Sequence, residues 1–240
     1  MTALKLQHHL AKAGIFSRRG ADAMIKQGYV RVNGVVIHDS LHRIDPAVDC
    51  ITFTEAITDY AHSLGYVLIH KPRGVWTNNK QHPKDTEVRD ILPPSFATYS
   101  SIGRLDKDSE GLILFTNDGV FANGFLNAGD RHERVYMVQT KRPLTPADIK
   151  RLMAGVRLSD GWTQPCTIQK TDSTTYRFTL IEGKNRQIRR MVESCRTQVA
   201  RLKRIQFGPY ELGDLPVGGH QWQSLQAVFM NRISGLPSPL

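Results

Sequence analysis

The chain has few cysteines and no long hydrophobic run. Its 240 residues include three cysteines, Cys50, Cys166 and Cys195, which lie far apart and form no CxxC pair. That number and spacing argue against a disulfide framework and against a structural zinc site. No stretch has the length and hydrophobicity of a secretory signal or a membrane span, so we expect a soluble, cytoplasmic protein.

Motifs for metals and nucleotides are also missing. The nine histidines show no ligand spacing, and the chain contains neither GxGxxG nor a Walker loop. Asp106, Asp108 and Glu110 are spaced like the start of a calcium loop. The ninth and twelfth positions of that loop fall on Leu114 and Asn117, where a bidentate glutamate is required at the twelfth. The sequence therefore predicts no metal site and no cofactor.

The chain is strongly basic. It carries 32 Lys and Arg against 22 Asp and Glu, a formal net charge of +10, and its pI is near 9.7. This balance favours a polyanionic partner. The excess lies in residues 61–240 and is densest in residues 185–204, where Glu193 is the one acidic residue. The basic residues of that segment are Arg186, Arg189, Arg190, Arg196, Arg201, Lys203 and Arg204.

The first 60 residues predict a small helical module. Apolar residues in 4–15 follow helical spacing, and Ser17 is a candidate N-cap for a second helix over 18–27. Asn33-Gly34 between two β-branched runs then predicts a hairpin with a type I′ turn. We expect a first domain over 1–60 and a second over 61–240, with residues 53–65 joining them.

The second domain is predicted to be rich in strands, with a few helices that do not alternate regularly with them. This order favours an α+β fold with a mostly antiparallel sheet. The expected strands cover 66–71, 112–115, 134–139, 176–181 and 199–207, and the expected helices cover about 87–92, 120–126, 146–154 and 185–194.

One stretch concentrates the chemistry. Gly103-Arg104-Leu105-Asp106-Lys107-Asp108-Ser109-Glu110-Gly111 is an acidic, turn-rich loop that leads directly into the apolar run 112–115. A carboxylate and a guanidinium held at the start of a buried strand suit an active site. The alternative is an ordinary turn in which Asp106 only accepts hydrogen bonds from the backbone.

The stretch GRLDKDSEGLILFTNDG resembles the catalytic motif of the RsuA-type pseudouridine synthases, which isomerise uridine in ribosomal RNA. Three further blocks resemble the same family in the same order: HKPRGV at 70–75, RVYMV at 134–138 and EGKNRQIRRMVE at 182–193. The N-terminal module is similar to the αL RNA-binding module first recognised in a small-subunit ribosomal protein. The resemblance covers nearly the whole chain.

This resemblance implies roles for three residues. Asp106 matches the essential carboxylate, which acts at C1′ or C2′ of the ribose. Tyr136 matches the aromatic residue on which the extruded base stacks, and Arg189 matches the basic partner that keeps the carboxylate ionised and oriented. The reaction uses no cofactor and no metal. The family fold is a mostly antiparallel mixed sheet that follows the N-terminal module.

Further basic residues are expected to contact RNA, because flipping a nucleotide costs a few kcal/mol that phosphate contacts must offset. They are Lys71, Arg73, Arg104, Arg186 and Arg190 in the second domain, and Arg18 and Arg19 in the N-terminal module. Gly20 stands where the family usually has Glu, which removes a capping-box acceptor and weakens the helix by roughly 1 kcal/mol.

The target RNA is inferred from three stretches. GRLDKDSEGLI, AGDRHERVY and NRQIRRM look similar to the RluF-like branch of the family, which implies 23S large-subunit rRNA and also a tRNA anticodon uridine as substrates. Two alternatives stay open: a small-subunit (16S) rRNA pseudouridine synthase, and a non-enzymatic RNA-binding protein for ribosome assembly. We expect a monomer.

Overall fold

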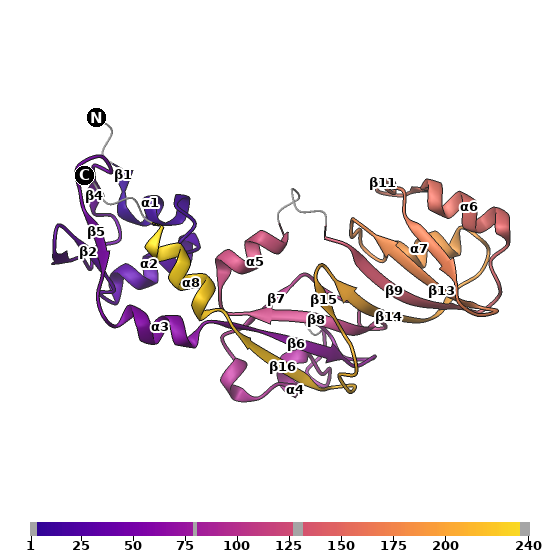
Figure 1. Cartoon of the computed structure of the whole chain (residues 1–240). Helices are drawn as coiled ribbons and strands as arrows, with labels where there is room; N and C mark the ends of the chain where they lie inside the picture. Colours follow the sequence, from indigo (N-terminus) through magenta and orange to yellow (C-terminus); the bar gives the residue numbers. More distant parts are fainter. Residues whose placement is uncertain (1–3, 79–80, 127–131, 236–240) are drawn as a thin grey trace. The chain divides into compact units, whose positions relative to one another are not determined.

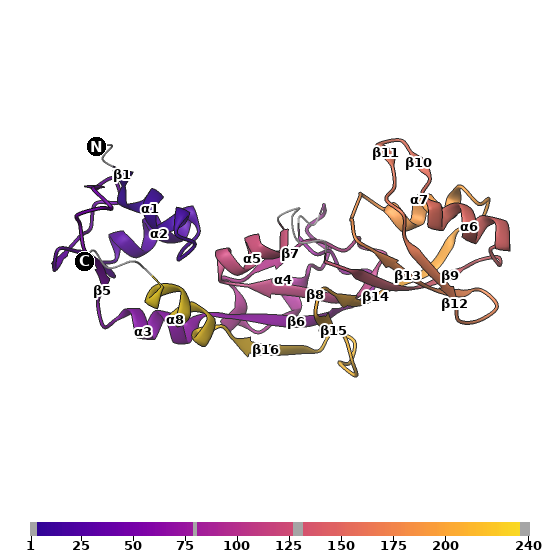
Figure 2. The ribbon, with the colours of Figure 1, turned by 45° about the horizontal axis from the view of Figure 1, so that its top comes forward.

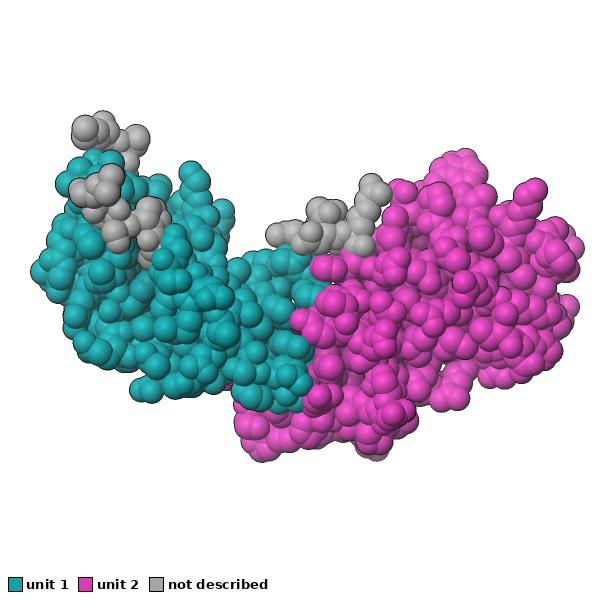
Figure 3. All heavy atoms as spheres, viewed as in Figure 1, with its two compact units in different colours: residues 1–67, 116–125, 222–240 teal, residues 68–115, 126–221 magenta. Residues whose placement is uncertain are grey.

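The structure is a computed structural model that describes residues 4–78, 81–126 and 132–235 (Figure 1). Part of the AGDRHERVY stretch, residues 128–131, lies outside this range, as do residues 79 and 80. The chain forms two compact units, coloured separately in Figure 3. Unit 1 consists of residues 1–67, 116–125 and 222–240, and unit 2 of residues 68–115 and 126–221.

The helices and strands of the described residues follow one another in a mixed order. The helices are α1 (Leu6–Lys12), α2 (Arg18–Lys26), α3 (Ile57–Ser63), α4 (Val88–Ile91), α5 (Gly119–Leu126), α6 (Pro146–Ala154), α7 (Gln187–Glu193) and α8 (Gln226–Ser234). The strands are β1 (Leu4–Lys5), β2 (Val30–Val32), β3 (Val35–Val36), β4 (Arg43–Ile44), β5 (Ile51–Phe53), β6 (Gly65–Lys71), β7 (Ser100–Ile102), β8 (Glu110–Thr116), β9 (Arg134–Thr140), β10 (Arg157–Leu158), β11 (Gly161–Trp162), β12 (Thr167–Lys170), β13 (Thr175–Leu180), β14 (Val199–Phe207), β15 (Tyr210–Glu211) and β16 (His220–Ser224).

Unit 1 begins with the predicted pair of helices and hairpin. The Ser17 hydroxyl accepts a hydrogen bond from the Gly20 amide at 3.1 Å, so half of a capping box is present at the start of α2. The turn between β2 and β3 has positive φ at both Asn33 (52°) and Gly34 (81°), as a type I′ turn requires. Strand β5 completes a sheet in the order β3-β2-β5.

The core of unit 1 also uses segments that are distant in sequence. Leu6 and Leu10 of α1 belong to the same buried cluster as Phe229 of α8. The Phe229 ring lies 5.6 Å from the ring of Phe16 and 5.3 Å from that of Tyr60 in α3. The sequence predicted neither α3 nor α8. The apolar stripe of α3 is short, and its central member is the small Ala61, so the pattern did not indicate a helix.

The largest sheet of the described residues has nine strands. Its strands follow the order β12-β13-β9-β14-β8-β6-β16, with β15 paired to β14 and β7 paired to β8. Strand β9 is antiparallel to β13 and β14, and β12 is antiparallel to β13, whereas β14 and β8 run parallel. This confirms the expected α+β class with a mostly antiparallel, mixed sheet.

The core of unit 2 lies on strands β9, β13 and β14. Tyr176 and Phe178 of β13 are fully buried, and the Tyr176 hydroxyl accepts a hydrogen bond from the Leu144 amide at 2.7 Å. Apolar residues of α7, including Ile188 and Met191, pack in the same cluster. Figures 1 and 2 both place α6 and α7 beside these strands. The sheet therefore fixes the helix that carries the arginines of the NRQIRRM stretch.

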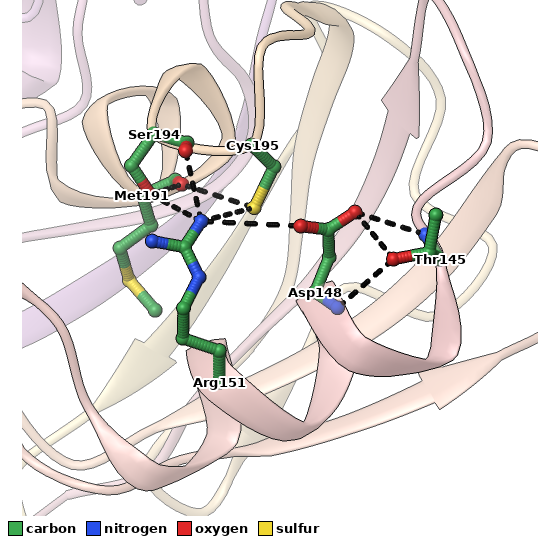
Figure 4. A network of polar contacts seen from close by, with 6 residues as sticks. All are labelled: Thr145, Asp148, Arg151, Met191, Ser194 and Cys195. Carbon is green, nitrogen blue, oxygen red and sulfur yellow. Dashed lines mark hydrogen bonds and ion pairs between the residues drawn. The ribbon is translucent and has the colours of Figure 1, made fainter.

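Helix α6 holds the end of α7 through a polar network (Figure 4). Thr145 and Asp148 form a complete capping box at the start of α6. One turn later, Arg151 donates from Nη2 to the Ser194 carbonyl at 2.8 Å and lies 3.2 Å from the Cys195 sulfur. Burial raises the pKa of the Cys195 thiol, with a smaller opposing effect from Arg151.

The described residues, 4–78, 81–126 and 132–235, were also searched for membrane-spanning helices and for clusters of metal ligands. No helix there is both long and apolar enough to cross a membrane. No three His, Cys, Asp or Glu side chains there gather in a way that could hold a metal ion.

Candidate active site

Asp106 lies on the loop between β7 and β8, in unit 2. Its side chain is 29% exposed, and its carboxylate Oδ2 is 3.9 Å from Nη1 of Arg186. The same Nη1 lies 3.7 Å from Oδ2 of Asp108. One guanidinium therefore faces both carboxylates of the loop.

The loop is fixed from one side by the segment that follows β6. The Thr77 hydroxyl donates to the carbonyl of Leu105 at 2.8 Å and accepts from the Leu105 amide at 3.0 Å. The Gly74 amide donates to the Lys107 carbonyl at 2.8 Å. Because Leu105 directly precedes Asp106, these bonds set the backbone from which the carboxylate projects.

Lys71 does not lie where its predicted RNA contact would require. Its side chain is fully buried, and its ammonium donates to the Ser109 carbonyl at 2.7 Å and to the Pro72 carbonyl at 2.9 Å. Burial lowers its pKa from 10.5 to about 8, an effect that Asp106, Asp108 and Glu110 partly offset. Lys71 therefore supports the loop from inside the protein and exposes no surface to phosphate.

The loop of residues 76–98 contacts Lys107, the neighbour of Asp106. The Lys107 ammonium is 2.8 Å from Oδ1 of Asp85 and 5.2 Å from the centre of the Trp76 ring. Asp85 and Trp76 therefore help to hold the Asp106 loop through Lys107.

The loop leads into β8 through a close backbone approach. Gly111 pairs with Arg204 of β14 and has φ of 107°. A Cβ at this position would come within 2.6 Å of the Arg204 backbone nitrogen and still nearer to its carbonyl oxygen. Only glycine fits here, so the apolar strand can lie directly beside β14.

A cavity of about 360 Å³ opens beside Asp106. It brings together four of the predicted residues: Asp106, Tyr136 and the exposed Arg104 and Arg186. Tyr136 is half-buried on β9, in register with Phe178 and with Arg204. The cavity thus has a carboxylate and an aromatic ring on its lining, together with several cations.

Arg189 lies behind the loop. Its side chain is 7% exposed and donates from Nη2 to the carbonyl of Asp108 at 3.0 Å. Burial lowers its pKa, and Arg186 lowers it further, whereas Asp108 and Asp106 oppose this shift. We expected Arg189 to pair with Asp106. Within the described residues, the guanidinium at ion-pair distance from Asp106 belongs to Arg186, and Arg189 bonds the loop backbone.

The arginines of the NRQIRRM stretch therefore have three different environments. Arg186 is exposed in the left-handed conformation (φ 46°) before α7, and Arg189 is buried. Arg190 makes two bonds to the Asp160 carboxylate, at 2.8 and 3.0 Å, and these bonds raise its pKa. Arg189 can be buried because the Asp108 carbonyl gives it a hydrogen-bond partner inside the protein.

Other cations of the 185–204 segment also have internal partners. Arg201 donates from Nε to the Glu110 carboxylate at 2.5 Å. Arg204 is 3% exposed and donates from Nε to the Leu112 carbonyl at 2.7 Å. Two of the seven basic residues of this segment therefore connect β14 to β8.

Two arginines of the cavity lining were not predicted as site residues. Arg134 and Arg204 both line the cavity, and their guanidinium carbons lie 5.1 and 4.8 Å from the centre of the Phe207 ring. Burial lowers the pKa of Arg134. The alternation of the RVYMV strand was the available signal, because Arg134 and Tyr136 are two residues apart and share a face of β9.

The remaining predicted RNA contacts are exposed. Arg73 donates from Nη1 to the Ala200 carbonyl of β14 at 3.5 Å. Arg18 and Arg19 are exposed in the first turn of α2 in unit 1, and neither has a hydrogen bond or ion pair among the described residues.

Comparison with known proteins gives the class of this chain. The family described as RNA pseudouridylate synthase matches residues 65–194, which is more than half of the chain. The S4 domain, an RNA-binding module, matches residues 4–47. The chain belongs to the RNA pseudouridylate synthase family and is an RNA pseudouridine synthase with an N-terminal S4 domain, as the sequence motifs predicted.

Individual members of the family are similar to this chain over most of its length. The chain is 35% identical to the dual-specificity RNA pseudouridine synthase RluF of Salmonella typhi, over 93% of this chain and 76% of RluF. It is 32% identical to the ribosomal large subunit pseudouridine synthase B of Bacillus subtilis, over 89% of both chains. A crystal structure of a pseudouridylate synthase superposes with a TM-score of 0.66 at 24% identity, over 95% of this chain and 99% of that one, which supports the fold.

Proposed function

We propose that this enzyme converts one uridine of large-subunit (23S) rRNA to pseudouridine, with Asp106 as the catalytic carboxylate. The observation that carries the proposal is the Asp106 carboxylate beside Arg186, at a cavity that Tyr136 also lines. The names of the relatives support the substrate, because one of them is a large-subunit enzyme.

The proposed reaction needs few groups. The N1–C1′ bond of the uridine breaks, the uracil turns within the site, and a C5–C1′ bond forms. The hydrogen on C5 leaves as a proton, and N1 of the product carries a proton. Atoms and electrons balance without an oxidant, a reductant or a second substrate. A carboxylate at the ribose is the main requirement, as a nucleophile at C1′ or as a base at C2′.

Five residues at or near the cavity have proposed roles. Asp106 acts at the ribose while Arg186, 3.9 Å away, stabilises its negative charge. Tyr136 supplies the face on which the detached uracil stacks. Arg104 is exposed at the cavity and holds the place of the flipped nucleotide or binds its phosphate. Arg189 keeps the loop backbone in position by its bond to the Asp108 carbonyl.

The S4 domain is proposed to add affinity without chemistry. Arg18 and Arg19 begin α2 with exposed side chains, which suits them to phosphate contacts that position a structured RNA. A tRNA anticodon uridine is a second proposed substrate. The similarity to RluF, a dual-specificity RNA pseudouridine synthase, supports a second substrate.

The direct test is a map of pseudouridine in total rRNA and tRNA. Cells with the intact gene are compared with cells that lack it and with cells that carry Asp106→Asn. We expect one large-subunit site, with or without a tRNA site, to disappear in both altered strains. Loss of a small-subunit site instead would reject the proposed target, and an unchanged map would reject the proposed function.

The purified Asp106→Asn protein separates chemistry from binding. We expect turnover to be abolished while RNA affinity changes by only a few-fold, because the substitution removes a charge without removing a phosphate contact. Single-turnover tritium release and equilibrium RNA binding measure the two quantities. Retained turnover in this variant would contradict the assigned role of Asp106.

A further inference from the structure

Unit 2 has a second hollow region on the other side of Arg186. One hollow of about 320 Å³ is lined by Arg73, Lys141, Arg186, Arg189, Glu193 and Gln198, among others. A neighbouring hollow of about 350 Å³ is lined by Lys141, Arg142, Glu193, Arg196, Thr197 and Gln198. The two share Lys141, Glu193 and Gln198, so they form one continuous depression, here called the basic groove.

The basic groove is rich in exposed cations. Its exposed basic residues are Arg73, Lys141, Arg142, Arg186 and Arg196. Asp108 and Glu193 are the acidic side chains on its lining, and Asp108 already lies 3.7 Å from Arg186. The groove lining therefore has an excess of positive charge. By contrast, Arg190 and Arg201, in the basic segment 185–204, form ion pairs with Asp160 and Glu110.

Backbone contacts hold these cations in place. The Lys141 amide donates to the Gln198 carbonyl at 2.8 Å, and the Arg142 amide donates to the Thr197 hydroxyl at 3.1 Å. The Lys141 ammonium also donates to the Gln198 side chain at 2.7 Å, and the Arg142 guanidinium donates to the carbonyl of Arg196. The floor of the groove is thus a fixed platform, which lowers the entropy cost of binding a ligand.

The buried side of the groove has an unmet donor. Arg189 lines the first hollow and is 7% exposed, yet its Nε has no hydrogen-bond partner among the described residues. Burial lowers the pKa of Arg189, and the charges of Arg186 and Arg73 add to this shift. A bound anion would offset the repulsion among these three guanidinium groups.

Arg186 connects the groove to the catalytic cavity, because it lines both. An RNA strand with its target uridine in the cavity would bring the phosphates of neighbouring nucleotides to the groove. We propose that the basic groove binds the sugar–phosphate backbone of the substrate RNA on one flank of the target uridine. This inference rests on the proposed function and adds the path of the strand, with Lys141, Arg142 and Arg196 as new phosphate contacts.

The test compares two double variants that remove the same charge. Lys141→Gln with Arg196→Asn alters the groove, and asparagine tolerates the left-handed conformation of Arg196 (φ 58°). Lys150→Gln with Lys170→Gln is the control, since both lysines are exposed and outside the groove. Each pair is made in the Asp106→Asn background, and binding to a large-subunit rRNA transcript is measured at several salt concentrations.

We expect the groove pair to weaken binding and to lower the slope of log affinity against log salt by about 1.4–1.8, at about 0.7–0.9 per lost phosphate contact. The control pair should leave both values unchanged. Equal effects of the two pairs, or no effect of the groove pair, would overturn the proposal.

A variant that is expected to bind RNA more tightly is a useful second test, because misfolding would lower the affinity and could not raise it. Glu193→Gln removes an acidic residue from the groove lining, so it should tighten RNA binding and steepen the salt dependence. Unchanged or weaker binding by this variant would count against the groove.

Activity measurements separate this proposal from the proposed function. With Asp106 intact, the groove pair should raise KM several-fold with a much smaller change in kcat. If the groove pair leaves KM for the mapped uridine unchanged, the proposed role of the groove is rejected while the proposed function is retained. If the groove pair weakens RNA binding but the pseudouridine map shows no site that depends on this protein, the proposed function is rejected and the proposal that the groove binds RNA is retained.

Discussion

At the scale of single residues, the same residue type serves opposite purposes in this protein. Arg186 is exposed beside Asp106, whereas Arg190 is neutralised by Asp160. Lys71, which was expected to contact RNA, is buried against carbonyls that include that of Ser109 in the Asp106 loop. Sequence shows where charge is dense, and the tertiary partners decide which charges reach RNA.

The buried ammonium of Lys71 should make stability depend on pH. Because burial lowers its pKa from 10.5 to about 8, the folded protein releases this proton at a lower pH than the unfolded chain does. Stability should therefore increase as the pH rises from 8 to 10.5, by at most about 1.4 kcal/mol per pH unit. Below pH 8 both states are protonated and this dependence disappears.

Lys71→Met is the matched control for that titration. The difference in unfolding free energy between wild type and Lys71→Met, measured in urea at pH 7 to 10, should shift in favour of the wild type above pH 8. A difference that stays constant over this range would contradict a lowered pKa for Lys71.

The candidate site was predictable in its residue types and less so in its contacts. The GRLDKDSEG loop and the RVYMV strand placed Asp106, Arg104 and Tyr136 together, and all three line one cavity. The identity of the cation nearest Asp106 did not follow, because Arg186 itself has a left-handed backbone conformation before α7. No periodicity argument anticipates that backbone conformation.

At the scale of secondary-structure elements, local signals were decisive where capping residues were present. Thr145 and Pro146 predicted the start of α6, and its bounds agree with the expected 146–154. Helices α3 and α8 lack a side-chain cap, and both were missed. Their helical form depends on burial against α1 and α2, which is tertiary information.

The capping box of α6 gives a test at this scale. Thr145→Ala should lower the unfolding free energy by about 1 kcal/mol, because the hydroxyl that accepts from the Asp148 amide is lost. Thr145→Ser keeps a hydroxyl and should retain most of the stability. Urea unfolding of both variants provides the comparison, and equal losses would argue against the cap.

At the scale of the whole molecule, the two compact units have separate hydrophobic clusters. The expected division at residue 60 treated the N-terminal module as continuous in sequence. Unit 1 consists of three segments, because the apolar residues of α5 and α8 pack with those of α1 to α3. Sequence patterns report neighbours along the chain, so such a unit could not be read from them.

The Phe229 side chain should matter for unit 1 in particular. Phe229→Ala removes a ring that is 1% exposed and should cost about 3–5 kcal/mol. Hydrogen exchange should accelerate in residues 4–67 and remain slow in residues 132–221. Val228→Ala, at a site that is 46% exposed on the same helix, should change neither region. Uniform acceleration across both units would contradict separate cores.

The position of α8 also bears on how the protein is made. A ribosome completes residues 4–67 well before it adds Leu225 and Phe229, and between them it synthesises the entire Asp106 loop and the strands around it. Residues 4–67 therefore emerge with part of the hydrophobic core of unit 1 missing. That core is completed only when α8 is released, so these residues reach their final packing after the whole Asp106 loop has been synthesised.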